Sequence, residues 1–385
     1  MFRAFRALPR ITQHVRIYNS PHLQHQHLAS RYPILIDGLQ LLRSHGRHFS
    51  LSSIHPVILA PLVFVGLTLT LWSYKCLMMV LFQSRIIYMP SIPPGARREK
   101  ISDYAAYCRG IQWTEGILTT SDRKTLATAS ATVGGSSNAD NGNQKEFVIV
   151  YFQGNASSTP PRLPELSSVL SRLSSSPAKT TLLIPSYRGY WNSTGSPSQR
   201  GIEKDLVAIF SHLNDAYPTA DIILWGQSIG CGISVHGLAE APVALQKRVK
   251  GVLLETPFVS IRNMLVAVYP QKWLPYRYLG RFLWNTWELV VALEKAIKAG
   301  WNGRVLIMQA GADELVPEGQ AGKILEVVEK AGLQGELEVV RKALHVECLT
   351  KPGGMPRVVG WLHELLMEKK EACKNGEMRR DGKTK

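Results

Sequence analysis

Short apolar runs of strand length alternate with amphipathic segments of helical length over most of this chain. Residues 201–216, for example, repeat Leu, Val, Ile and Phe at three- and four-residue steps, the spacing of a helix with one buried face. The apolar runs are hydrophobic on both faces, which is typical of strands covered by helices on both sides. The pattern therefore predicts an α/β fold with a mostly parallel central sheet. The predicted strands are residues 147–152, 180–186, 221–225, 251–258, 304–311 and 337–342, and the other predicted helices are residues 163–173, 230–240, 318–331 and 356–369.

Two regions depart from this alternation. Residues 116–121 and 124–132 have the pattern of a β-hairpin that precedes the first buried strand. Residues 258–302 have helical spacing and many aromatic side chains, and they interrupt the succession of strand and helix. We interpret residues 258–302 as a helical cap inserted over one edge of the sheet, within a domain of residues 101–367.

A long uncharged segment precedes this domain. Residues 57–74 contain 18 consecutive residues without a charge, and the apolar run continues after Lys75. A helix of this length can cross a bilayer, and Lys75 can extend toward the membrane surface from near its end. The sequence therefore predicts one transmembrane anchor within residues 56–88. A basic arm, residues 1–55, precedes it, and a charged tail, residues 368–385, ends the chain.

The net charge of +16 is concentrated at the ends of the chain. Residues 1–100 contain 12 basic and 2 acidic residues, whereas residues 101–367 contain 26 basic and 23 acidic ones. Basic ends beside an apolar segment favour a lipid bilayer as the partner. They argue against nucleic acid, which would need a basic face on the folded part. The five cysteines are widely spaced without a Cys-x-x-Cys pair, so neither disulfides nor a zinc site is predicted.

Residues 226–230 read Gly-Gln-Ser-Ile-Gly and directly follow the predicted strand 221–225. The helical pattern of residues 230–240 begins at once after them. A serine on a sharp turn between a strand and a helix is the arrangement of a hydrolase nucleophile, and the strained turn requires small neighbours. Gly226 and Gly230 supply them. Ser228 is therefore the predicted nucleophile, and a turn serine without chemistry is the alternative.

A serine needs a base, and the base needs an acid that orients it. In a parallel sheet these residues should follow later strands, in the order acid and then histidine. Asp313 follows the strand 304–311, and His345 follows the strand 337–342. Asp313 is therefore the predicted acid and His345 the predicted base. Glu314, the neighbour of Asp313, and Glu255, near the end of an earlier predicted strand, are the alternatives for the acid.

The negative oxygen formed during acyl transfer needs two N–H donors. One donor should be the backbone N–H of Ile229, the residue after the nucleophile. The other should come from the loop after the strand 147–152, where Gly154 lets the chain turn. We predict the N–H of Asn155 as the second donor, with Ala156 as its competitor.

Several longer motifs resemble one known family. They are YFQGNASS, PSYRGYWNSTGSPSQRGIEKD, GQSIG, LLETPFVSIRNM, YPQKWLPYRYLG and GADELVP. Over residues 101–367 the chain resembles the α/β-hydrolase superfamily, and within it the membrane-anchored abhydrolase-domain group related to bud-emergence proteins. Gln153, Cys231 and Val346 depart from the residues common in that group, but all three predicted triad members are present.

The resemblance implies an α/β-hydrolase fold and a membrane-anchored serine hydrolase. Such an enzyme cleaves acyl esters or thioesters, often of lipids, as an esterase, lipase or thioesterase, and it requires no metal or organic cofactor. A single-pass endomembrane location, the endoplasmic reticulum, is favoured. The arginine-rich segment 1–36, which contains no acid, indicates a mitochondrial membrane as the alternative.

Two other functions compete with hydrolysis. One is a membrane scaffold that keeps the hydrolase fold without activity, because a fold alone does not establish chemistry. The other is an NAD(P)-dependent oxidoreductase, since residues 226–232 also read as a glycine-rich loop after a strand. Dinucleotide loops follow the first strand of their domain, however, and several strands precede this one.

Overall fold

The computed structural model describes residues 55–135 and 145–367, so nearly all of the predicted basic arm and the whole charged tail lie outside the described residues. The described part contains one eight-stranded sheet. Its strands are β1 (Thr114–Thr119), β2 (Thr125–Val133), β3 (Glu146–Phe152), β4 (Lys179–Pro185), β5 (Asp221–Gln227), β6 (Val249–Glu255), β7 (Arg304–Ala310) and β8 (Gly335–Val340).

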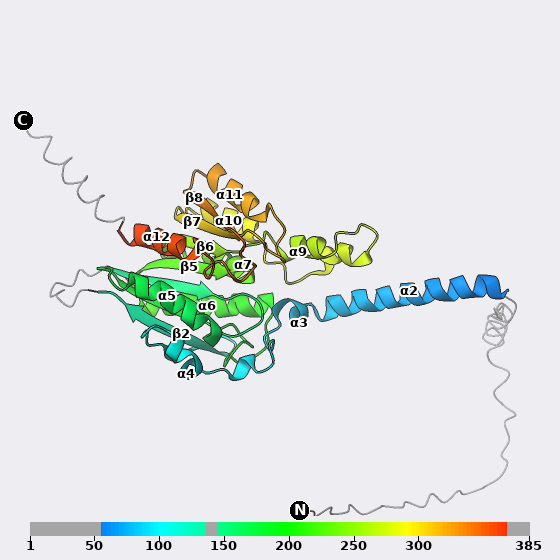
Figure 1. The fold of residues 1–385 in the computed structure, drawn as a ribbon, viewed down its shortest axis with the longest axis horizontal. Helices are drawn as coiled ribbons and strands as arrows, with labels where there is room; N and C mark the ends of the chain where they lie inside the picture. Colours follow the sequence, from blue (N-terminus) through cyan, green and yellow to red (C-terminus); the bar gives the residue numbers. More distant parts are fainter. Residues whose placement is uncertain (1–54, 136–144, 368–385) are drawn as a thin grey trace, which may run out of the picture. The chain divides into compact units, whose positions relative to one another are not determined.

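The sheet has the order β1-β2-β4-β3-β5-β6-β7-β8 (Figure 1). The strand β2 runs antiparallel to both of its neighbours, and all pairs from β4 to β8 are parallel. The predicted hairpin is therefore β1 and β2, and the predicted mostly parallel sheet is confirmed. Because β3 and β5 to β8 point the same way, the loops that follow them meet at one edge of the sheet.

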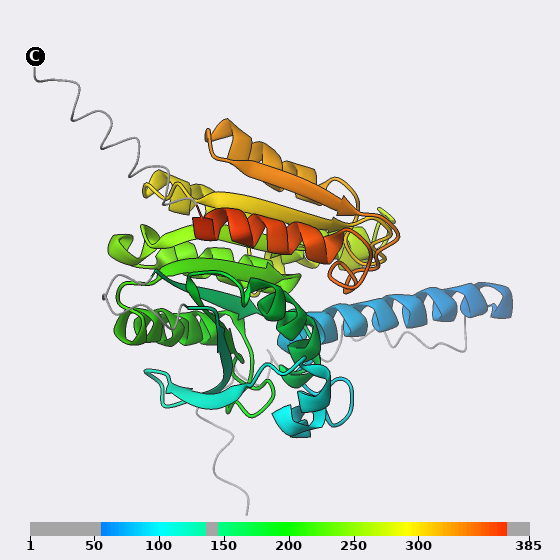
Figure 2. The same cartoon turned by 60° about the vertical axis from the view of Figure 1, so that its left-hand side comes forward.

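Alternate residues of each central strand point to opposite faces and belong to two separate cores. Val148, Val150 and Phe152 pack with α6 (Gln199–Ala216), α7 (Ile229–Glu240) and α11 (Gln320–Lys330). Phe147 and Ile149, on the other face, pack with α5 (Leu163–Leu173) and α12 (Gly354–Met367), which is red in Figure 2. Helices thus cover both faces, as the doubly apolar strands predicted. The helix α6 begins where the Ser198 hydroxyl accepts the N–H of Gly201.

The region predicted as a cap contains α9 (Ile261–Val268), the 3₁₀ segment η5 (Pro275–Phe282) and α10 (Leu289–Lys298). The side chain of Ser260 caps α9 by accepting the N–H of Asn263. The helix α10 packs against α7 on the sheet, so it is the ordinary helix between β6 and β7. The cap region therefore ends at Glu288, just before α10, whereas the sequence pattern predicted its end at residue 302. The strand β6 ends at Glu255 rather than at residue 258, because Thr256 has a left-handed φ of 49° and Pro257 has no N–H for the sheet.

One described helix, α2 (Pro56–Leu81), is long and apolar enough to cross a membrane. None of its 26 residues is buried. The short helix α3 (Gln83–Tyr88) follows it and is held by hydrogen bonds to the end of the cap region. The carbonyl oxygen of the Gln83 side chain accepts the N–H groups of Trp284 and Asn285, and the Tyr88 hydroxyl donates to the Asn285 side chain. The small helices α4 (Ile101–Tyr104) and α8 (Val243–Gln246) lie in connecting segments.

A buried ion pair joins the loop after β4 to α6. The guanidinium of Arg188 lies 2.7 Å from the carboxylate of Asp205 and 2.9 Å from that of Asp122. The Asp205 side chain is fully buried, and it also accepts the backbone N–H of Arg188. Arg188 is therefore a structural ion-pair partner, and removal of Asp205 would leave its buried guanidinium paired with Asp122 alone.

We expect Asp205→Ala to lower the free energy of unfolding by about 3–5 kcal/mol, because Arg188 would stay buried with its main partner lost. Urea titration of the full chain in detergent measures the change. Asp215→Ala is the matched control, since Asp215 is an exposed residue of the same helix. Equal stability of the two variants would contradict the structural role of the ion pair.

Candidate active site

Ser228 lies on the sharp turn between β5 and α7, with φ 52° and ψ −119°. This left-handed φ is costly for a residue with a side chain, and close packing around the turn maintains it. A Cβ on Gly226 would lie 2.5 Å from the carbonyl oxygen of Gly230. A Cβ on Gly230 would overlap the carbonyl oxygen of Phe152, where α7 meets the end of β3. Both glycines are therefore needed for the reason that the sequence predicted.

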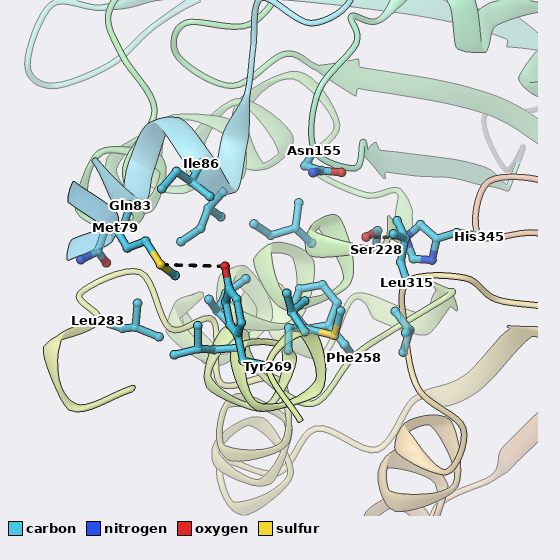
Figure 3. Close-up of a pocket in the computed structure, with 17 residues that line it drawn as sticks. Met79, Gln83, Ile86, Asn155, Ser228, Phe258, Tyr269, Leu283, Leu315 and His345 are labelled. Carbon is cyan, nitrogen blue, oxygen red and sulfur yellow. Dashed lines mark hydrogen bonds between the residues drawn. The ribbon is translucent and has the colours of Figure 1, made fainter. Parts of the chain in front are cut away.

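The structure brings Ser228, His345 and Asp313 together at the edge where the parallel strands end. The Nε2 atom of His345 lies 2.8 Å from the Oγ atom of Ser228 (Figure 3). The Nδ1 atom of His345 lies 2.9 Å from Oδ2 of Asp313 and 3.1 Å from Oδ1. These contacts join residues that lie 117 and 32 positions apart along the chain. The arrangement fits a serine, a base and an acid that orients the base.

The three acidic candidates have different partners. Only Asp313 contacts the His345 ring, and its Oδ1 also accepts the N–H groups of Leu315 and Val316. Glu314 accepts the backbone N–H of His345 at 3.0 Å, so it holds the loop and not the ring. The Glu255 carboxylate accepts from the indole N–H of Trp225. The geometry thus favours Asp313 among the three.

The pKa values of Asp313 and Glu255 also favour Asp313 as the orienting acid. Burial alone would raise the pKa of Asp313, but hydrogen bonds from His345 and from the N–H of Val316 lower it below the ordinary value. Asp313 is therefore ionised at neutral pH, as an orienting acid must be. Burial raises the pKa of Glu255 to about 7, because fewer hydrogen bonds compensate its charge. Its Oε1 has no hydrogen-bond partner among the described residues.

The loop after β3 lies directly against the nucleophile. A Cβ on Gly154 would lie 3.6 Å from the Cβ of Ser228. The N–H of Ala156 donates to the carbonyl oxygen of Tyr88, so this competitor for the oxyanion role is already engaged. Asn155 and Ile229 both line the cavity beside Ser228, and within residues 55–135 and 145–367 their backbone N–H groups have no acceptor. Asn155 and Ile229 therefore remain the candidates for the oxyanion hole.

A mostly apolar cavity of about 310 Å³ opens beside Ser228 and His345. Figure 3 shows Phe258 and Leu315 near the serine, with Tyr269, Met79 and Leu283 farther along the cavity. Asn155, Ser228 and His345 gather at one end, and the rest of the wall is mostly hydrocarbon, with the Gln83 amide and the Tyr269 hydroxyl at the far end. The cavity can therefore accept an apolar chain whose reactive group lies at the polar end.

The sequence pattern did not reveal that α2 and α3 contribute to this cavity. Met79, Gln83, Ile86 and Ile87 line it, although residues 56–88 were interpreted only as an anchor. The Tyr269 hydroxyl of the cap lies 3.9 Å from the Met79 sulfur. One signal was present in the sequence, because the apolar run continues for seven residues after Lys75. Periodicity cannot distinguish a side chain that faces lipid from one that faces an apolar cavity.

The described residues contain no group of three or more His, Cys, Asp or Glu side chains that could hold a metal ion. The glycine-rich turn at residues 226–232 is closed by protein atoms, since the backbone of Phe152 and Gln153 occupies the space next to Gly230. A pyrophosphate would need that space for close approach to the backbone.

No protein-family model matches the chain. Among curated proteins it is similar to Protein bem46 of Schizosaccharomyces pombe, with 31% identity over 45% of this chain and 53% of that protein. It is also similar to the lysophosphatidylserine lipase ABHD12 of Danio rerio, with 29% identity over 46% of each chain. The match thus spans about half the length of these relatives, and it agrees with the resemblance drawn from the motifs.

Among solved structures, an alpha-beta hydrolase from Vibrio vulnificus has a TM-score of 0.54 to this chain. The match covers 74% of this chain and 92% of that one, at 17% sequence identity. A likeness at this identity concerns the fold, and it confirms the predicted α/β-hydrolase fold.

We expect Gly230→Ala to destabilise the protein by about 1–3 kcal/mol, because the new methyl group would be forced against the backbone of β3. Gly322→Ala, in α11, is the matched control, since a Cβ there meets nothing within 4 Å. The control should be neutral, or more stable by up to roughly 1 kcal/mol. Thermal unfolding in detergent measures both changes, and a neutral Gly230→Ala would show that the turn can relax.

Proposed function

We propose that this α/β hydrolase is a membrane-anchored serine hydrolase that cleaves acyl esters or thioesters of lipid-like substrates. Ser228, His345 and Asp313 form its catalytic triad, and the N–H groups of Ile229 and Asn155 form its oxyanion hole. The observation that carries the proposal is the 2.8 Å contact between His345 Nε2 and Ser228 Oγ at the polar end of an apolar cavity. The lipase name of the relative ABHD12 is consistent with it.

The proposed reaction has two steps. His345 Nε2 takes the proton of the Ser228 hydroxyl while Oγ forms a bond to the substrate carbonyl carbon. The carbonyl oxygen becomes an oxyanion, which accepts the N–H groups of Ile229 and Asn155. The leaving alcohol or thiol then departs with the proton from His345, and the acyl group stays on Ser228. Water repeats the sequence, with His345 as base, and releases the acid and the serine.

Asp313 fixes the tautomer of His345 that can accept the proton of Ser228. Its carboxylate accepts the Nδ1–H of His345, which leaves Nε2 unprotonated and facing Ser228. The lowered pKa of Asp313 keeps it charged when the imidazole becomes protonated. Glu314 holds the His345 backbone, so the ring is positioned from both its side-chain and its main-chain ends.

The cavity and α2 support the choice of substrate and location. A wall of methionine, leucine, isoleucine, valine and phenylalanine side chains suits an acyl chain, and it offers no charged group to bind a polar metabolite. The length and composition of α2 suit a single membrane crossing. We assign the protein to an endomembrane, the endoplasmic reticulum, and keep a mitochondrial membrane as the alternative.

The two competing functions make different demands on the site. A silent scaffold has no need for a strained serine with a histidine at hydrogen-bond distance, and strain of this kind is usually kept where it serves function. An oxidoreductase needs open space at its glycine-rich turn, and the backbone of β3 fills that space. Labelling by a serine-directed probe therefore separates hydrolase from scaffold.

We expect a fluorophosphonate probe to label the wild-type chain and not Ser228→Ala. His345→Gln should lower the turnover of a soluble ester by about four orders of magnitude or more, because the base is lost. His363→Gln is the matched control, since His363 lies on α12 and its ring nitrogen is hydrogen-bonded to the carbonyl oxygen of Arg172, away from Ser228. Labelling of Ser228→Ala at the wild-type level would defeat the proposal.

The acyl cavity gives a second prediction. Met79→Trp should reduce kcat/KM for long-chain esters by about tenfold or more, since the larger side chain shortens the cavity. Short-chain esters should be hydrolysed at the wild-type rate. Leu77→Trp, two residues away on an exposed face of α2, is the control. A profile of hydrolysis against acyl chain length measures the change, and an unchanged profile in Met79→Trp would exclude this cavity as the acyl site.

A further inference from the structure

The segment between α9 and α10 presents large apolar side chains to solvent. We call residues 269–284 the cap tip. Trp273, Tyr278, Phe282 and Trp284 of this segment are all exposed, and Trp273 keeps 67% of its surface accessible. Side chains of this size grouped on one segment usually mark an interaction surface.

The cap tip lies beside the C-terminal part of α2. The rings of Trp72 and Trp273 have centroids 5.8 Å apart. The ammonium of Lys75 lies over the rings of Tyr276, at 4.2 Å, and Tyr269, at 5.6 Å. The hydrogen bonds of Gln83 to the end of the cap tip fix the two segments to each other. The cap tip therefore lies beside residues 72–83, at the same position along the axis of α2.

This level corresponds to a membrane surface if α2 spans the bilayer. The helix from Pro56 to Lys75 is about 28 Å long at 1.5 Å per residue. That length equals about one hydrocarbon core, roughly 30 Å. Lys75 and Trp72 then lie at the interface, where tryptophan, tyrosine and lysine are enriched. The cap tip, packed against them, must lie at the same depth.

The charges of both segments match an anionic surface. From Thr256 to Trp287 the chain has no acidic residue, and its basic residues are Arg262, Lys272, Arg277 and Arg281. From Pro56 to Arg98 it again has no acidic residue, with Lys75, Arg85, Arg97 and Arg98. Lys272 and Arg281 are exposed on the cap tip itself. These basic side chains attract anionic lipid headgroups, and neither segment has an acidic side chain that would repel a lipid phosphate.

We infer that the cap tip is a second membrane contact, inserted into the headgroup layer of an anionic bilayer beside α2. The inference rests on the proposed membrane crossing by α2. The aromatic side chains lie at the boundary of the hydrocarbon, and Lys272 and Arg281 bind lipid phosphates. A soluble protein partner is disfavoured, because α2 brings the cap tip to the bilayer whatever else is present.

This contact also gives the active site a route to lipid. Tyr269 belongs both to the cap tip and to the wall of the cavity, and Met79 of α2 lies against it. A lipid at the membrane surface beside the cap tip can therefore pass its acyl chain between α2 and α9 toward Ser228. The carbonyl group would follow to the polar end of the cavity.

Photo-crosslinking tests this position in the full chain. A benzophenone amino acid replaces Tyr278, or Phe282 as a second site, and the protein is placed in nanodiscs of phosphatidylcholine and phosphatidylserine. Tyr107, an exposed tyrosine of the segment Ala105–Tyr107, is the matched control, and Leu71, exposed on α2, is the positive control. We expect lipid adducts at positions 278, 282 and 71, and none at 107. Hydrolysis of a soluble ester by each variant reports on folding and, separately, on the proposed catalysis.

The other outcomes each decide the question. Adducts at 71 without adducts at 278 or 282 would overturn the inference and leave the anchor intact. No adducts at 71, 278 and 282 would overturn both the membrane crossing and the inference. Adducts at 278 with a second copy of the chain in place of lipid would assign the surface to self-association and overturn the lipid contact.

A charge reversal tests the preference for anionic lipid. Adduct yield at position 278 should rise severalfold as phosphatidylserine replaces phosphatidylcholine. Lys272→Glu with Arg281→Glu should abolish this rise, and Lys247→Glu with Lys298→Glu, two exposed lysines elsewhere, should preserve it. A yield that is independent of phosphatidylserine in the unmodified chain would overturn the role of the basic side chains.

Discussion

The close approach of α7 to the end of β3 is the constraint on which the active site depends. Because Gly230 has no side chain, α7 begins in contact with the backbone of Phe152 and Gln153. This contact forces the turn at Ser228 into its strained conformation and directs the hydroxyl out of the sheet edge. It also places the loop at Gly154 and Asn155 next to the serine. The missing Cβ of Gly230 thus positions Ser228 and brings the loop at Asn155 beside it.

The parallel sheet supplies the remaining partners from a distance. Since β5, β7 and β8 point the same way, the loops after them reach one edge, and Ser228, Asp313 and His345 meet there. Each side chain is held by its own backbone surroundings. The N–H groups of Leu315 and Val316 hold Asp313, and Glu314 holds the His345 main chain. The candidate site is therefore held by hydrogen bonds around His345 and Asp313 and lined mostly by apolar side chains on the side of the cavity.

Much of this arrangement follows from local sequence. The doubly apolar strands, the glycines around Ser228 and the order of Asp313 and His345 are properties of short segments or of chain topology. Asp313 was the predicted acid, and coordinates were needed to show which donors Glu314 and Glu255 meet instead of the His345 ring. The cap boundary also needed them, since α10 has the helical spacing of a cap segment but packs on α7. The role of Glu314 in holding the loop had no signal in the sequence.

The helix α2 shows why hydrophobic patterning cannot separate an anchor from an active-site wall. Before Lys75, exposed leucine, valine and phenylalanine side chains suit lipid. After Lys75, Met79 is apolar because it lines the cavity, and Gln83 is buried because it binds the cap tip. Apolar side chains thus have two different uses in this segment: those before Lys75 suit lipid, and those after it line the cavity. The candidate membrane helix and the cavity beside Ser228 are therefore not separable, because removal of residues 56–82 would take Met79 out of the cavity wall.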